Sequence, residues 1–74
     1  MITVMIYADG NDSTGTLVGV YATEREAHQA AARALGSRSL RGASSWPAAA
    51  GVVYQFGKRA DTDVNPCAEL IFAQ

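Results

Sequence analysis

The sequence predicts an α+β fold in which one helix packs on one face of a four-stranded antiparallel sheet, in the element order β-β-α-β-β. Three observations favour this fold. Apolar residues alternate at the start of the chain, a capped alanine-rich segment follows, and two further strand-like runs come after it. A chain of 74 residues has room for one domain, residues 1–74, with a thin core.

Two strands are predicted before the helix. Residues 2–7 alternate with the period of a strand. One side of this strand carries Ile2, Val4 and Ile6, and the other side carries Thr3, Met5 and Tyr7. Residues 9–15 are rich in turn formers, and residues 16–21 give the second strand of an antiparallel hairpin. Gly19 inside this strand indicates a bulge or a close backbone approach.

The helix is predicted over residues 24–35. Thr23 and Glu26 have the spacing of a capping box. We expect the Thr23 hydroxyl to accept a hydrogen bond from the Glu26 amide, and the Glu26 carboxylate to bond the Thr23 amide. Gly36 is a suitable residue to end the helix. One apolar stripe is expected to face the sheet, and it consists of Ala27, Ala30, Ala31, Ala34 and Leu35.

The second half of the chain predicts a long loop and two strands. Residues 37–51 show no periodicity, which indicates a loop whose length is typical of functional or mobile segments. Residues 52–58 predict the third strand, residues 59–66 a polar connection, and residues 68–73 the fourth strand. In the fourth strand, Leu70 and Phe72 are expected on the face opposite to that of Ile71.

One short helix cannot cover both faces of such a sheet. If the side with Ile2, Val4 and Ile6 faces the helix, Met5 and Tyr7 lie on the uncovered face. That face is then more apolar than a solvated surface requires, so we expect it to contact another molecule or the long loop.

Charge is segregated along the chain. The net charge is −1, but residues 1–27 carry −3, residues 28–59 carry +5, and residues 60–74 carry −3. The basic third contains Arg33, Arg38, Arg41, Lys58 and Arg59. These cations predict either a patch that meets phosphates or an acidic protein surface, or a solvated loop whose arginines interact with helix C-terminal carbonyls. The acidic balance of the whole chain argues against nucleic acid as the main partner.

No arrangement of residues indicates catalysis. His28 is the single histidine, and no Ser, Cys or Asp lies near it at helical spacing, so we interpret it as a residue on the solvent side of the helix. Cys67 has no second cysteine for a disulfide and no neighbouring base, which favours a buried structural thiol. We therefore expect no enzyme and no cofactor.

A metal site is not expected either. Asp61, Asp63 and Asn65 resemble the start of a calcium-binding loop. However, Pro66 stands where that loop needs glycine, and Phe72 stands where it needs a bidentate glutamate. A loop stabilised by side-chain-to-backbone hydrogen bonds fits this segment better.

The N-terminus has neither a basic region nor a cleavage site typical of a signal peptide, and no apolar run is long enough to cross a bilayer. With a single cysteine as well, we expect a cytoplasmic protein without membrane association.

Residues 19–27, with the sequence GVYATEREA, resemble a pattern of many short phage and bacterial open reading frames, in which a strand leads into a capped helix. In size and in its lack of catalytic residues, the chain is similar to phage-encoded host-takeover proteins, which include anti-CRISPR inhibitors and modulators of host RNA polymerase. The resemblance implies inhibition or modulation of a larger host machine, and it assigns no role to an individual residue.

The leading hypothesis is a non-catalytic binding protein whose partner is a host protein or nucleoprotein complex. Arginine and tryptophan are enriched where binding energy is concentrated. The expected contact residues are therefore Arg38, Arg41 and Trp46, with Tyr7 and Met5 as secondary contacts.

Two alternatives remain open. A single-stranded nucleic-acid-binding module would stack bases on Tyr7, Tyr21 and Tyr54 beside the basic segment, provided that these tyrosines share one face. A structural homodimer would pair open sheet faces or edge strands of two copies.

Overall fold

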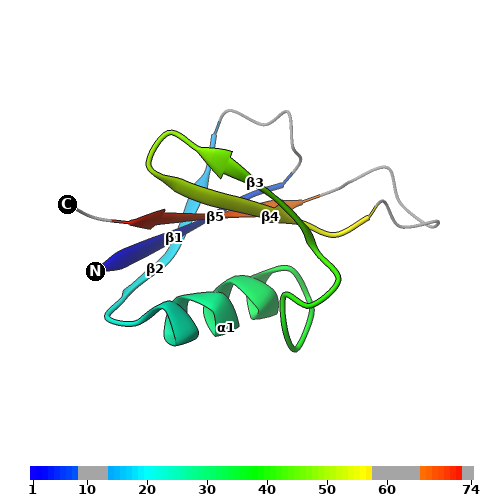
Figure 1. Ribbon diagram of the computed structural model, residues 1–74, viewed down its shortest axis with the longest axis horizontal. Helices are drawn as coiled ribbons and strands as arrows, with labels where there is room; N and C mark the ends of the chain where they lie inside the picture. Colours follow the sequence, from blue (N-terminus) through cyan, green and yellow to red (C-terminus); the bar gives the residue numbers. More distant parts are fainter. Residues whose placement is uncertain (9–13, 58–65, 73–74) are drawn as a thin grey trace.

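The computed structural model describes residues 1–8, 14–57 and 66–72, which form five strands and one helix (Figure 1). In chain order the elements are β1 (Ile2–Tyr7), β2 (Thr16–Tyr21), α1 (Glu24–Ala34), β3 (Ser44–Ala48), β4 (Gly51–Gln55) and β5 (Cys67–Phe72). The strands form one sheet in the order β2-β1-β5-β4-β3, and every neighbouring pair is antiparallel.

The prediction of a four-stranded sheet in the order β-β-α-β-β is wrong. The additional strand, β3, lies inside residues 37–51, which were predicted as a loop. Its sequence does not alternate and it contains Pro47, so it lacks the pattern of a strand. Residues 44–48 are extended because they pair with β4 across the turn at Ala49 and Ala50. Pro47 is tolerated there because β3 lies at the edge of the sheet.

The predicted hairpin of the first two strands is confirmed. Val4 pairs with Gly19 and Met5 with Leu17, so Val18 is the extra residue of a bulge in β2. A Cβ atom at Gly19 would lie 2.7 Å from the hydroxyl oxygen of Tyr21, so a side chain at this position would displace the end of the Tyr21 side chain. Most of the predicted turn at residues 9–15 lies outside the described residues, and so does the predicted connection at residues 59–66 except for Pro66.

The N-terminal cap of α1 follows the prediction in part. The Thr23 hydroxyl accepts a hydrogen bond from the Glu26 amide at 3.2 Å, as expected. The same hydroxyl donates to the Glu26 carboxylate at 3.0 Å, whereas the sequence predicted that the Thr23 amide would donate to that carboxylate. Glu24 and Glu26 place two negative charges in the first turn, which favours the helix dipole.

The helix ends one residue before the predicted boundary, with Leu35 as its cap. Gly36 adopts a φ of 80°, a conformation that favours glycine. The amides of Gly36 and Ser37 then donate to the carbonyls of Arg33 at 2.9 Å and Ala32 at 2.8 Å. These two bonds satisfy carbonyls at the end of the helix and turn the chain toward β3.

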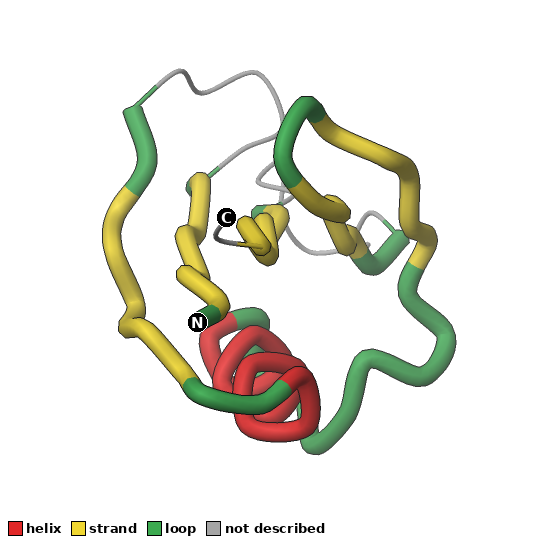
Figure 2. The backbone as a smooth tube through the Cα atoms, turned by 60° about the vertical axis from the view of Figure 1, so that its left-hand side comes forward, coloured by secondary structure: helices red, strands yellow, loops and turns green. Residues whose placement is uncertain are grey.

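Helix α1 lies on one side of the sheet, where it contacts β1, β2 and β5 (Figure 2). The buried core between these layers consists of Ile2, Val4, Ala27, Ala31, Leu35, Ala68 and Leu70. The predicted alanine stripe is therefore correct in part: Ala27, Ala31 and Leu35 pack in the core, and the small alanines allow a close approach to the sheet. Ala30 and Ala34 are half-buried, whereas Ala32, outside the predicted stripe, is fully buried. Leu40 and Tyr54 pack against this core beside the helix. We call the opposite side of the sheet, on which α1 does not pack, the open face.

Gly51 determines how closely β4 approaches β5. A Cβ atom at this position would lie 1.7 Å from the carbonyl oxygen of Leu70, which is inside the radius of that atom. The amide of Phe72 also donates to the carbonyl of Ala50 at 2.9 Å, which extends the contact beyond the strand itself. A residue with a side chain at position 51 would push these two strands apart.

Candidate functional site

The open face carries a row of side chains that crosses all five strands. The register of the sheet places these residues next to one another in the order Leu17, Met5, Glu69, Val53 and Trp46. A neighbouring row follows the order Val20, Thr3, Ile71, Gly51 and Ala48. The first row therefore contains four apolar side chains and one carboxylate at its centre.

Several of these apolar side chains are exposed. Leu17 is 58% exposed, Val20 49% and Trp46 41%. Within the described part of the chain, no helix or strand packs on this face, because α1 contacts the sheet from the other side. Two exposed apolar side chains thus lie on edge strand β2 and one on the opposite edge strand, β3. A surface rich in exposed apolar side chains is typical of an interaction site.

Glu69 places a negative charge in the middle of the open face. It lies on β5, the central strand of the sheet. The hydroxyl of Tyr7 donates a hydrogen bond of 2.9 Å to the Oε1 atom of Glu69, and this pair is partly buried. Among the described residues of the open face, Glu69 is the one that carries a charge. The carboxylate is therefore held in a defined position within apolar surroundings.

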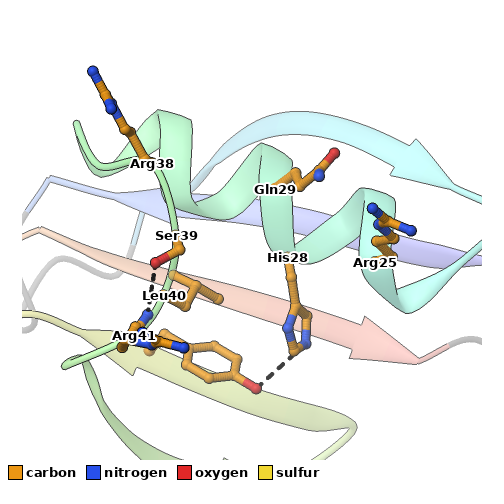
Figure 3. Close-up of a pocket in the computed structure, with 8 residues that line it drawn as sticks. Arg25, His28, Gln29, Arg38, Ser39, Leu40 and Arg41 are labelled. Carbon is orange, nitrogen blue, oxygen red and sulfur yellow. Dashed lines mark hydrogen bonds between the residues drawn. The ribbon is translucent and has the colours of Figure 1, made fainter.

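A pocket of about 480 Å³ opens on the helix side of the sheet (Figure 3). We call it the arginine pocket, and its lining residues are Arg25, His28, Gln29, Arg38, Ser39, Leu40, Arg41 and Tyr54. They come from α1, from residues 38–41 of the following loop, and from β4. Three guanidinium groups thus border one pocket, and none of its lining residues is acidic.

The loop that supplies two of these arginines has a defined conformation. The Ser37 hydroxyl donates to the carbonyl of Ser39 at 2.9 Å, and the Arg41 amide donates to the Ser39 hydroxyl at 3.3 Å. The Ala43 amide closes a further turn on the carbonyl of Leu40 at 3.0 Å. These bonds direct Leu40 toward the core and leave the side chain of Arg41 exposed at the pocket.

His28 lies differently from the prediction, which placed it on the solvent side of the helix. It is half-buried, and its ring meets that of Tyr54 edge-on, with centroids 5.4 Å apart and an interplanar angle of 65°. Its Nε2 atom lies 3.5 Å from the Tyr54 hydroxyl oxygen, at the long limit of a hydrogen bond. Figure 3 shows Arg25 and Arg38 at opposite ends of the opening, with Gln29 between them.

The predicted contact residues divide between these two surfaces. Arg38 and Arg41 line the arginine pocket. Trp46, Met5 and Tyr7 lie on the open face. For Trp46 this follows because the preceding residue, Ser45, pairs with Tyr54 on the helix side. The sheet therefore separates residues that the sequence analysis placed in one group.

Six lining residues of the pocket were not among the predicted contact residues, namely Arg25, His28, Gln29, Ser39, Leu40 and Tyr54. Of these, Arg25, His28 and Tyr54 come from the helix and from β4. Tyr54 joins the other two only because β4 follows β5 in the sheet, and nothing in the sequence reveals that strand order. A usable signal was present for α1, since Arg25, His28 and Gln29 recur at the helical spacing that places residues on one side.

The remaining basic residues do not join this pocket. Arg33 lines a second, smaller pocket of about 200 Å³, which also contains Glu26. Lys58 and Arg59 lie outside the described residues. In the folded chain, Arg38 and Arg41 therefore border the same pocket as Arg25, whereas Arg33 borders a different pocket.

The tyrosines do not share a face. Tyr7 is on the open face, whereas Tyr21 and Tyr54 pack against the core on the helix side. The base-stacking arrangement required by the nucleic-acid alternative is therefore not formed by these three residues.

Potential ligands for metal ions do not gather in the described part of the chain. Its His, Cys, Asp and Glu residues form no group of three or more. The calcium-like segment with Asp61, Asp63 and Asn65 lies outside the described residues. Cys67 is buried, in agreement with the prediction of a buried cysteine.

Helix α1, the helix in the described residues, is too short and too polar to span a bilayer. No protein family matches this sequence, and no curated protein or solved structure is significantly similar to the chain.

Proposed function

We propose that this chain is a non-catalytic binding protein that docks on a larger protein through the open face of its sheet. The observation that carries the proposal is the row of largely apolar side chains that crosses all five strands, with Leu17 and Trp46 exposed at its ends. Val20, a second exposed apolar residue of β2, lies on the same face. Exposed apolar area of this kind raises the free energy of the isolated protein, and a partner that covers it recovers that free energy.

Each exposed apolar side chain contributes a part of the binding free energy. Full burial of a large apolar side chain contributes roughly 1.5–3 kcal/mol, and these side chains are about half exposed, so each contributes on the order of 1 kcal/mol. Trp46 is the strongest anchor, since tryptophan is enriched among residues that dominate binding energy. Leu17 and Trp46 stand at opposite ends of the row, so full engagement requires a partner that spans the sheet.

A second copy of this chain is a poor partner for this surface. A two-fold axis through the middle of two facing sheets would bring two Glu69 carboxylates together in apolar surroundings, where like charges repel strongly.

The position of Glu69 instead defines the chemistry of the partner. A carboxylate that loses water on docking needs a compensating charge, so the partner presents an apolar surface with a lysine or arginine opposite Glu69. The Tyr7 hydroxyl fixes the carboxylate before binding, which lowers the entropic cost of forming that ion pair.

The resemblance to phage-encoded host-takeover proteins supports a partner that belongs to a bacterial host, and modulation or inhibition of that partner as the outcome. A small protein without catalytic chemistry acts in such a case by covering a surface that its partner uses.

The test is photo-crosslinking in nuclease-treated bacterial lysate, followed by binding measurements with the purified partner. A photoreactive phenylalanine analogue is placed at Leu17 or at Val20, and a matched control carries it at Arg33 on the helix. We expect one protein to crosslink from both open-face positions and not from Arg33. With that protein purified, Leu17→Ser combined with Trp46→Ser should weaken binding at least thirtyfold, and Glu69→Gln at least fivefold.

The double variant Arg38→Gln/Arg41→Gln serves as the binding control and should retain the wild-type affinity. Equal crosslinking from Arg33, or unchanged affinity of the Leu17→Ser/Trp46→Ser variant, would show that the open face is not the docking surface. A dimer at low micromolar concentration in sedimentation, dissociated by Leu17→Ser/Trp46→Ser, would replace the proposed partner with a second copy.

A further inference from the structure

The arginine pocket concentrates positive charge that no described group neutralises. Among residues 1–8, 14–57 and 66–72, no carboxylate forms a salt bridge with Arg25, Arg38 or Arg41. The three side chains are exposed. Cations that border one opening repel one another, and an anion that binds between them relieves this repulsion.

The polar groups of the pocket suit an anion with several oxygen atoms. A guanidinium group donates two parallel hydrogen bonds to phosphate or carboxylate oxygens. The Ser39 hydroxyl and the Gln29 amide add neutral donors between the arginines. Three guanidinium groups balance a phosphate or diphosphate, which carries about −1.5 to −2 charges per terminal group, better than a single carboxylate with −1.

The pocket is also larger than an inorganic ion needs. Its volume of about 480 Å³ falls in the range of roughly 300–1,000 Å³ that is typical of sites for small organic molecules. Its inner wall is formed by Leu40 and by the edge-on rings of His28 and Tyr54. Aliphatic and aromatic groups of this kind pack against the flat ring of a ligand.

We propose that the arginine pocket binds a small organic phosphate with a planar ring, of the size of a mononucleotide. The phosphates pair with arginines at the rim of the pocket, and the ring lies against Leu40 and Tyr54. This site is on the opposite side of the sheet from the docking surface, so the inference does not rest on the proposed function.

The test is calorimetric titration at constant ionic strength with ADP, pyrophosphate and adenosine as separate ligands. We expect ADP to bind tighter than pyrophosphate or adenosine, because only ADP engages both the arginines and the apolar wall. Arg41→Gln should weaken ADP binding at least fivefold and leave adenosine binding unchanged. Arg33→Gln is the matched control, since it removes an exposed arginine outside this pocket, and it should change ADP affinity less than twofold.

Amide chemical shifts locate the ligand, and we expect the largest ADP-dependent changes at residues 38–41 and at Tyr54. The inference is overturned if ADP and pyrophosphate show no saturable binding, or if Arg33→Gln weakens ADP binding as much as Arg41→Gln does. Citrate that binds as tightly as ADP would show that the pocket does not select phosphate. A twelve-nucleotide single strand that binds while ADP does not would assign the arginines to a nucleic-acid backbone instead.

Discussion

The two faces of the sheet are built from alternate residues of the same strands, yet they differ in almost every property. On the helix side of β5, Leu70 is completely buried beneath alanines of α1. On the open side of the same strand, Glu69 and Ile71 remain partly exposed, whereas Cys67 at the start of the strand is buried. One set of positions therefore carries the stability of the molecule, while the other set is available for recognition. Substitutions on the two faces can test the two roles separately.

The largest expected effect comes from Gly51→Ala, which should abolish the difference between the faces by disrupting the sheet. The added Cβ atom collides with the backbone of Leu70, and neither strand can move away without losing hydrogen bonds. We expect a loss of at least about 4 kcal/mol in the free energy of unfolding, measured by urea denaturation.

Gly57→Ala is the matched control, because nothing lies within 4 Å of a Cβ atom at that position. Its midpoint of unfolding should equal that of the wild type or exceed it slightly. Equal destabilisation by both substitutions would show that β4 and β5 do not approach as closely as described.

Two leucines sharpen the comparison between the faces. Leu70→Ala leaves a cavity in the core and should cost about 3 kcal/mol of unfolding free energy. Leu17→Ala removes a side chain that is 58% exposed on the open face and should cost less than about 0.5 kcal/mol. Thermal or urea unfolding measures both, and similar losses for the two variants would contradict an uncovered open face.

The smallest expected effect distinguishes two tyrosines, one on each face. Tyr7→Phe removes the 2.9 Å hydrogen bond to Glu69 and should destabilise the protein by about 1 kcal/mol. Tyr54→Phe removes only the 3.5 Å contact with His28, so its cost should stay below about 0.5 kcal/mol. A larger loss of stability for Tyr54→Phe in the same unfolding experiment would show that the stronger polar contact lies on the helix side.

The elements with strong local signals could be predicted from the sequence. The capping box at Thr23, the alanine stripe and Gly36 fix the helix through interactions within a few residues. The alternation of residues 2–7 correctly predicts which side chains of β1 face the core. These features depend on neighbours along the chain, so they are visible without knowledge of the fold.

The features that were not predicted depend on residues that are distant along the chain, or on a strand whose sequence has no periodic pattern. Strand β3 forms through backbone pairing with β4, and backbone hydrogen bonds leave no periodic signal in side chains such as Ser45 and Pro47. The arginine pocket requires β4 to lie where Tyr54 meets His28 of α1. Trp46 and Arg41 are close in sequence, but one lies on the open face and the other at the pocket on the helix side.

Both outer strands of the sheet contain an interruption. The bulge at Val18 disturbs the hydrogen-bond ladder along β2, and Pro47 removes an amide donor from β3. Such interruptions hinder the addition of further strands at a sheet edge, which is the route by which β-rich proteins grow into fibres. At high concentration the molecule can thus expose an apolar surface while its own copies are discouraged from extending the sheet.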